Sequence, residues 1–168
     1  MKTAIENRIT RRALVAGGAS LLAAGPALAQ IPNVPYYEIQ QAQQSVVNTA
    51  YRFVDKTVGD GECGTFVAAV LDSLSYPHSG YVWGKPIPKL QYGCVIQMTN
   101  AKWEAPVGNG EFHTDTQHTA IVLGGSGGML DVIHQNWGVK KVIVSSLNMN
   151  WKMTRGKIEF YQPGPWGL

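Results

Sequence analysis

Apolar residues in the first half of the chain recur at the spacing of amphipathic helices. A first helix, from Glu38 to about Asp55, is predicted by the positions Ile39, Ala42, Val46, Ala50, Phe53 and Val54. A second helix is predicted to open at Asp60 or Gly61 and to end at Pro77, because proline cannot continue a helix. Its buried side is predicted to consist of Phe66, Val67, Val70, Leu71 and Leu74.

After Pro88 the pattern changes to short runs of β-branched and aromatic residues, separated by glycine, asparagine and polar turns. The sequence GGSGG at 124–128 predicts a tight hairpin between the second and the third run. Helices followed by an antiparallel sheet of about five strands predict an α+β domain. The five runs are 94–99, 118–124, 129–136, 141–146 and 157–163.

The first 29 residues have the pattern of an export signal. They contain basic residues, an apolar run and a small-residue end, Ala-Leu-Ala, before Gln30. The pair Arg11-Arg12 is typical of the twin-arginine type. A membrane anchor is disfavoured, because the run 13–29 is short for a bilayer span and contains glycine and proline. We therefore expect a periplasmic or secreted domain at 30–168 with no stable membrane anchor.

The net charge of the chain lies in the predicted signal. The whole sequence has 14 Lys and Arg against 11 Asp and Glu, and the signal holds four of the former and one of the latter. The remaining ten and ten make a neutral domain, which has no basic surface for nucleic acid or anionic lipid. At this size we expect one ordinary domain that acts as a monomer.

A cysteine lies where the second helix is predicted to begin. Cys63 follows a glycine-rich turn in the stretch GDGECGTFVAAVLD at 59–72. A helix N-terminus favours a thiolate, and its free amides can hold an oxyanion, so a nucleophile fits this position. A nucleophilic cysteine also needs a base and a group that orients the base.

Two of the four histidines are predicted to lie at one end of the sheet. His78 follows the end of the second helix, and His113 lies in a polar loop. His118 begins a strand, and His134 lies late in the next one, in phase with Asn136. The start of one antiparallel strand neighbours the end of the next, so these three residues should meet. A helix N-terminus at the same end of the sheet would add the cysteine.

Three motifs, in order along the chain, resemble the CHAP family of cysteine- and histidine-dependent amidohydrolases and peptidases. GECGTFVAAV resembles the Cys-x-x-Phe-Val start of the family's helix, and HTAIVLG resembles the strand that opens with the catalytic histidine. VIHQNW, the third motif, resembles the strand with the third site residue. In addition to these three, GKIEFYQP is similar to the family's closing strand. The similarity covers roughly 59–162. Related NlpC-type cell-wall peptidases often have a histidine at the third position.

The resemblance implies a papain-like cysteine hydrolase. Cys63 would be the nucleophile and His118 the base, with His134 or Asn136 as the orienting group. The implied substrate is the peptide part of peptidoglycan, cleaved at an amide bond, with no metal and no organic cofactor. Trp137, directly after the third motif, is the candidate substrate-binding residue.

The chain departs from the family pattern at two positions. The family usually has Glu where this chain has His134, so a neutral imidazole or Asn136 would replace a carboxylate as the orienting group. The family's first strand usually opens with Gly-Asp, whereas this chain has Gly93-Cys94. The second departure removes a carboxylate and adds a second thiol.

Other interpretations of Cys63 remain open. A disulfide with Cys94 requires Cα atoms within about 7 Å, whereas the predicted sheet separates the two by about 15–20 Å. A zinc site of Cys63, His118 and His134 has suitable ligand types but no close-spaced ligand pair. A non-catalytic binding or effector-like module that retains the fold is also compatible with the missing carboxylate.

Overall fold

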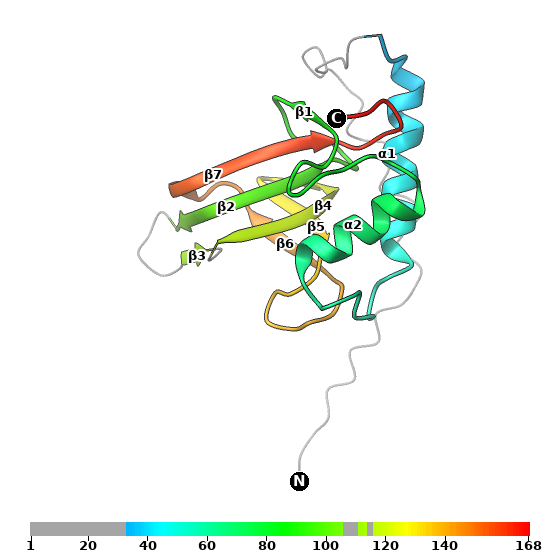
Figure 1. Cartoon of the computed structure of the whole chain (residues 1–168). Helices are drawn as coiled ribbons and strands as arrows, with labels where there is room; N and C mark the ends of the chain where they lie inside the picture. Colours follow the sequence, from blue (N-terminus) through cyan, green and yellow to red (C-terminus); the bar gives the residue numbers. More distant parts are fainter. Residues whose placement is uncertain (1–32, 106–110, 114–115) are drawn as a thin grey trace.

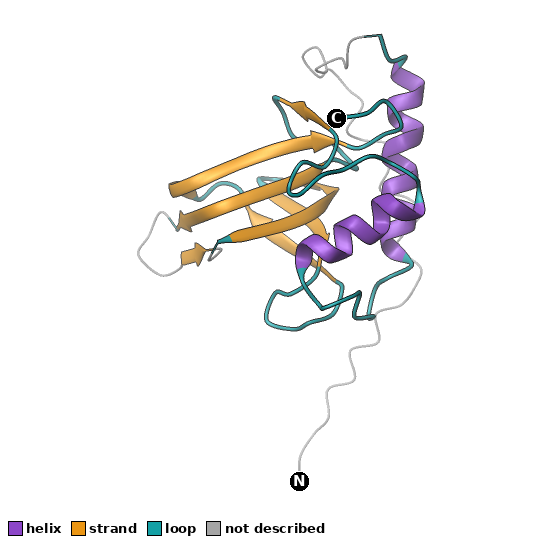
Figure 2. Cartoon of the chain, in the orientation of Figure 1, coloured by secondary structure: helices purple, strands orange, loops and turns teal. Residues whose placement is uncertain are grey.

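Two helices lie on one side of an antiparallel sheet (Figure 1). The computed structural model describes residues 33–105, 111–113 and 116–168. The predicted signal at 1–29 lies outside these residues. Figure 2 shows the helices packed next to each other against the strands, with long connections around them. The predicted α+β class is confirmed.

Both predicted helices are present, and both are shorter than predicted. α1 spans Tyr36–Tyr51, and α2 spans Cys63–Ser73. The chain cannot stay helical to Asp55, because this residue has a φ of 66°, in the left-handed region. α2 begins only at Cys63, because Glu62 before it is extended, with φ −89° and ψ 152°. Neither described helix is both long and apolar enough to cross a membrane.

In the described part of the chain the sheet has seven antiparallel strands, two more than predicted. The strand order is β1-β7-β2-β4-β5-β6, and β3 pairs with β2 outside this path. The two additional strands, β1 and β3, have only three residues each, too few to show an alternating pattern. The bounds are β1 Lys85–Ile87, β2 Val95–Glu104, β3 Glu111–His113, β4 Gln117–Ser126, β5 Met129–His134, β6 Ile143–Asn148 and β7 Lys152–Gln162.

The predicted hairpin at 124–128 joins β4 to β5. Ser126 pairs with Met129, so Gly127 and Gly128 form a two-residue turn. Their φ values are 58° and 81°, a left-handed conformation that such turns require and that glycine adopts without strain. This turn is confirmed, and the pairing that it starts places His134 opposite Ala120.

Two hydrophobic clusters bury the two faces of the sheet. Ile121 and Ile133 belong to the first cluster, and Ala120 and Val122 belong to the second. Neighbouring residues of a strand point to opposite faces, so β4 contributes to both clusters. His118 shares the phase of Ala120 and therefore lies on the face away from the helices. The helix residues of the first cluster are Val46, Val47, Ala50, Phe66, Val67, Val70 and Leu71.

Candidate active site

Cys63 lies at the N-terminus of α2 and against the first residues of β4. Its side chain is only 6% exposed. The thiol donates to the backbone oxygen of Gln117 over 4.0 Å, and both the backbone and the side chain of Thr119 hydrogen-bond to the sulfur. The sulfur is therefore next to both chain neighbours of His118.

The surroundings of Cys63 favour the neutral thiol. Burial raises the pKa of the thiol above its ordinary value, and the carboxylate of Glu62 raises it further. Hydrogen bonds from Thr119 and Gly64 act in the opposite direction and only partly offset the burial. A reaction at Cys63 therefore needs a base that accepts the proton while the sulfur attacks.

His118 and His134 form a hydrogen-bonded pair. Nε2 of His118 lies 2.9 Å from Nδ1 of His134, and the two rings are nearly perpendicular. Trp137 packs edge-on against both rings, with centroid distances of 4.6 and 5.0 Å. Nε2 of His134 lies 2.7 Å from Oγ of Ser145. Both nitrogens of His134 are thus engaged, while Nδ1 of His118 makes no hydrogen bond to any described residue.

Burial keeps both imidazoles neutral. His134 is fully buried, and His118 is 6% exposed. Burial lowers the pKa of His118 to about 3, with a smaller contribution from the neighbouring His134. Burial alone lowers the pKa of His134 to about 4. At neutral pH each ring therefore has one N–H donor and one nitrogen lone pair.

Cys63 lies near the histidine pair, but within the described part of the chain its thiol forms no hydrogen bond with His118 or His134. Thr119, which contacts the sulfur, faces α2, whereas His118 faces the second cluster. Hydrogen bonds between catalytic groups are often long before a substrate binds, so the arrangement is compatible with a Cys–His pair.

Asn136 lies away from His118. Its Nδ2 donates to Oε2 of Glu62 at 2.6 Å, and Lys140 contacts the other oxygen of this carboxylate at 3.0 Å. Asn136 follows the end of β5 and has a φ of 62°, so it no longer has the strand phase on which its prediction rests. Of the two predicted orienting groups, His134 contacts the predicted base, and Asn136 ties the residue before α2 to the sheet.

Gln135, which the sequence did not indicate, holds the N-terminus of α2 against the sheet. It is fully buried between the strand end and the turn before the helix. Its Nε2 donates to the backbone oxygens of Val58 at 3.0 Å and Glu62 at 2.9 Å, and its Oε1 accepts from the Val58 amide at 2.7 Å. Because Glu62 precedes Cys63, these bonds position the sulfur. No pattern in the sequence distinguishes such a glutamine from any other polar residue.

Replacing Gln135 with leucine should lower the free energy of unfolding by about 2–4 kcal/mol. Three partly buried backbone groups lose their partners, at about 1 kcal/mol or more each. Gln41→Leu, at an exposed position of α1, is the matched control and should change this free energy by less than about 0.5 kcal/mol. Urea unfolding followed by circular dichroism measures both variants. Equal changes in the two would contradict a positioning role for Gln135.

Cys94 is a separate and fully buried thiol. Neither cysteine forms a disulfide. The sulfur of Cys63 lies beside Gln117, which pairs with Thr99 of β2. Cys94 precedes Thr99 by five residues, which places it roughly 16 Å away along the strand. Burial raises the pKa of Cys94 to about 12.

Thiol titration of the denatured, unreduced protein should therefore find two free thiols per chain. In the native protein Cys63 should react first, because Cys94 is fully buried. Cys63→Ala is the control and should leave one slowly reacting thiol. A count of zero in the denatured parent protein would mean that the two cysteines are bonded to each other.

The remaining histidines lie elsewhere. His78 hydrogen-bonds Asp72 at 3.0 Å and stacks on Trp83, with a centroid distance of 5.8 Å. The side chain of His113 lies outside the described residues. Within 33–105, 111–113 and 116–168, no three His, Cys, Asp or Glu side chains are arranged to hold a metal ion. The zinc interpretation of Cys63 thus receives no support from the arrangement.

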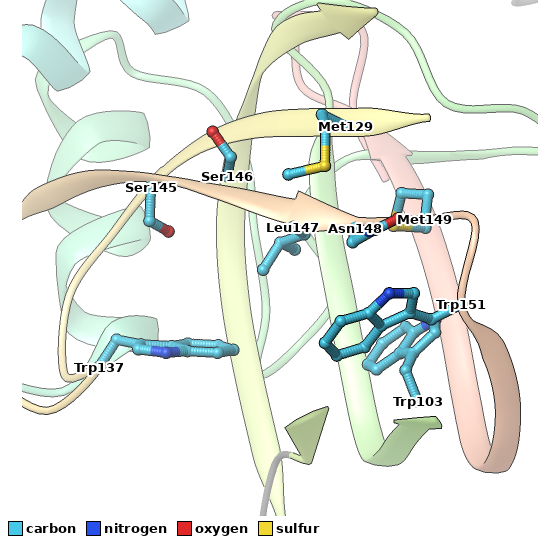
Figure 3. A pocket seen from close by; sticks show the side chains of 9 residues that line it. All are labelled: Trp103, Met129, Trp137, Ser145, Ser146, Leu147, Asn148, Met149 and Trp151. Carbon is cyan, nitrogen blue, oxygen red and sulfur yellow. The ribbon is translucent and has the colours of Figure 1, made fainter. Parts of the chain in front are cut away.

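A pocket of about 430 Å³, whose lining side chains Figure 3 shows, includes two residues that contact the histidine pair. Trp137 and Ser145 line it, and both also contact the imidazoles. A molecule in this pocket would therefore be separated from His134 only by Trp137 or Ser145. The role of Trp137 in binding substrate stays a prediction. The other lining residues are Trp103, Met129, Ser146, Leu147, Asn148, Met149 and Trp151.

No family model and no curated protein matches the chain. Among solved structures, the chain is similar to the crystal structure of Ly7917, with a TM-score of 0.49 and 17% sequence identity. The similarity covers 73% of this chain, and the chain spans 62% of the length of that protein. A similarity of this size carries no inference about function, which has to come from the geometry of the site.

Proposed function

We propose that the protein is an exported, papain-like cysteine hydrolase that cleaves an amide bond in the peptide part of peptidoglycan. Cys63 attacks the carbonyl carbon, and His118 accepts the thiol proton at Nδ1. His134 orients His118, and the Cys63 amide at the start of α2 donates to the oxyanion. The amide C–N bond then breaks, and the proton on His118 leaves with the amine, so that the acyl group stays on the sulfur. Water adds to the acyl carbon, the C–S bond breaks, and the carboxylic acid departs as a proton returns to the sulfur.

The hydrogen bond between His118 and His134 is the observation that carries the proposal. At 2.9 Å it engages Nε2 of His118, as an orienting group would, and leaves Nδ1 for the proton of the thiol. The contacts of Cys63 with Gln117 and Thr119 bring the sulfur to the two neighbours of the same histidine. The order of the three CHAP-like motifs along the chain agrees with these roles.

Digestion of purified peptidoglycan by the protein beginning at Gln30 tests the proposal. Hydrolysis of an amide should release soluble fragments with a new amine and a new carboxylate, and their masses identify the bond. Cys63→Ala, checked for native circular dichroism, is the control and should release none. Equal release by the two proteins would contradict a role for the thiol.

A second candidate is a non-catalytic binding or effector-like module. The burial of Cys63 and the raised pKa of its thiol favour it. The rate of alkylation by iodoacetamide distinguishes the two. In an enzyme, His118 should accept the thiol proton as Cys63 reacts, so His118→Gln should slow the alkylation at neutral pH. In a binding module, the rate should follow the small thiolate fraction and be the same in both proteins.

A further inference from the structure

A second reactive arrangement lies at the other end of the histidine pair. Oγ of Ser145 is 2.7 Å from Nε2 of His134, whose Nδ1 is 2.9 Å from Nε2 of His118. This is the arrangement of a nucleophile, a base and an orienting residue. The hydroxyl of Ser145 contacts one nitrogen of the base His134, and His118 holds its other nitrogen. The three residues come from the neighbouring strands β6, β5 and β4, so the register of the sheet fixes them.

Ser145 is the member of this arrangement that a ligand can reach. His134 is fully buried, whereas Ser145 is half-buried and lines the 430 Å³ pocket. Figure 3 shows Ser145 and Leu147 pointing to the side of β6 on which Trp137 lies, while Ser146 points the other way. The hydroxyl that contacts the base is therefore the one on the aromatic side of the strand.

The hydrogen bonds among the three residues can run in two directions. When Oγ of Ser145 donates to Nε2 of His134, Nδ1–H of His134 donates to Nε2 of His118. This direction presents the lone pair of His134 to the hydroxyl, as a serine nucleophile requires. The reverse direction leaves the lone pair on Nδ1 of His118, as Cys63 requires. Two neutral rings permit both directions.

We propose that Ser145, His134 and His118 form a second hydrolytic site, for neutral esters with an aromatic or branched apolar acyl group. Oγ forms a bond to the acyl carbon while its proton passes to Nε2 of His134. The ester C–O bond then breaks, and this proton leaves on the alcohol. Water next adds to the acyl carbon and gives a proton to His134, the bond to Oγ breaks, and the proton returns to Oγ as the carboxylic acid departs.

The pocket and the base both favour such a substrate. The lining has three indole rings, one leucine and two thioethers, and none of its nine residues is charged. Its volume of about 430 Å³ is within the range of small-molecule sites. The imidazolium formed at His134 is stabilised only by a neutral imidazole and not by a carboxylate. An ester needs less help than an amide, because its alcohol is the better leaving group.

Labelling with an alkyl fluorophosphonate tests this site, since the reagent forms an Oγ–P bond with an activated serine and releases fluoride. In the Cys63→Ala protein, peptide mass mapping should find the phosphonate on Ser145, and His134→Gln should remove it. Hydrolysis of p-nitrophenyl isobutyrate, whose acyl group is branched, should fall by at least about 100-fold in Ser145→Ala. Ser73→Ala, at an exposed position at the C-terminal end of α2, is the control and should stay within about twofold.

Two outcomes would overturn the second site: no phosphonate on Ser145 in the Cys63→Ala protein, or equal ester hydrolysis by Ser145→Ala and Ser73→Ala. Circular dichroism of each variant excludes unfolding as the cause. The readout is separate from that of the cysteine site. If Cys63→Ala no longer cleaves peptidoglycan but is still labelled on Ser145, both sites are supported. If Ser145 is labelled but the parent protein cleaves no peptidoglycan, only the serine site is supported.

Discussion

Replacing Cys63 with alanine should abolish amide hydrolysis, and replacing His134 with alanine should lower kcat by a factor of about 10–10³. General-base assistance contributes about 10²–10⁴-fold, and an orienting group acts only through the base. Because His134 is fully buried, alanine also leaves a cavity, which costs about 2–5 kcal/mol of stability. The kinetics should therefore be measured on a peptidoglycan fragment well below the unfolding temperature.

Two further variants make this series specific. His134→Glu places a carboxylate between the donors of His118 and Ser145, which should raise the pKa of His118 and restore kcat to the parent value or above. Asn136→Gly is the control, because alanine would strain a residue whose φ is 62°. A neutral His134→Ala with a damaging Asn136→Gly would show that Asn136 orients the base. Activity retained in Cys63→Ala would remove the cysteine mechanism altogether.

The helices and the long strands could be predicted because each repeats its pattern over several turns or pleats. Four residues of the predicted α2 stripe are buried, namely Phe66, Val67, Val70 and Leu71. The fifth, Leu74, follows the end of the helix and is only half-buried. The ends were less accurate, because the left-handed conformation at Asp55 and the extended one at Glu62 are set by local contacts. β1 and β3 have three residues each, and strands of that length exist only through their partners.

Part of the site could be predicted because strand register is regular. The alternation along β4 and β5 and the glycine turn between them were enough to bring His118 next to His134. The same regularity failed for Asn136, which leaves the strand and turns its amide to Glu62. A pattern of residue types does not show where a strand stops.

Ser145 and Gln135 could not be found in the sequence for a different reason. Serine and glutamine are common on exposed strand positions, and only three-dimensional contacts distinguish these two. Ser145 belongs to β6, which pairs with β5. His134 of β5 was predicted only to lie next to β4, on the other side of its strand. Gln135 points to a turn 77 residues earlier in the chain.

Acid should unfold this protein through the buried histidine pair. The pKa values of His118 and His134 are lowered by burial to about 3 and about 4 in the native state, whereas an unfolded histidine has a pKa of about 6.5. Between these values the unfolded chain binds more protons, so stability is complete above pH 6.5 and falls as the pH decreases toward 4. At about 1.4 kcal/mol per pH unit, each imidazole can remove up to about 3 kcal/mol by pH 4.

Urea unfolding at pH 7, 6, 5 and 4 gives the number of protons taken up on unfolding as the slope of stability against pH. The pair should contribute nearly two protons in the parent protein, and His118→Gln or His134→Gln should each lower the slope by about one. Asn136→Gly, at the same end of the sheet, removes no titrating group and should keep the parent slope. Because carboxylates contribute equally to all four proteins, the difference isolates the imidazoles. Slopes that are the same in the parent and in both glutamine variants would mean that the rings are hydrated and titrate normally. In that case the native pKa values would not be lowered, but both rings would still be mostly neutral bases above about pH 7, so this outcome would overturn the acid sensitivity and not the roles proposed for the two rings.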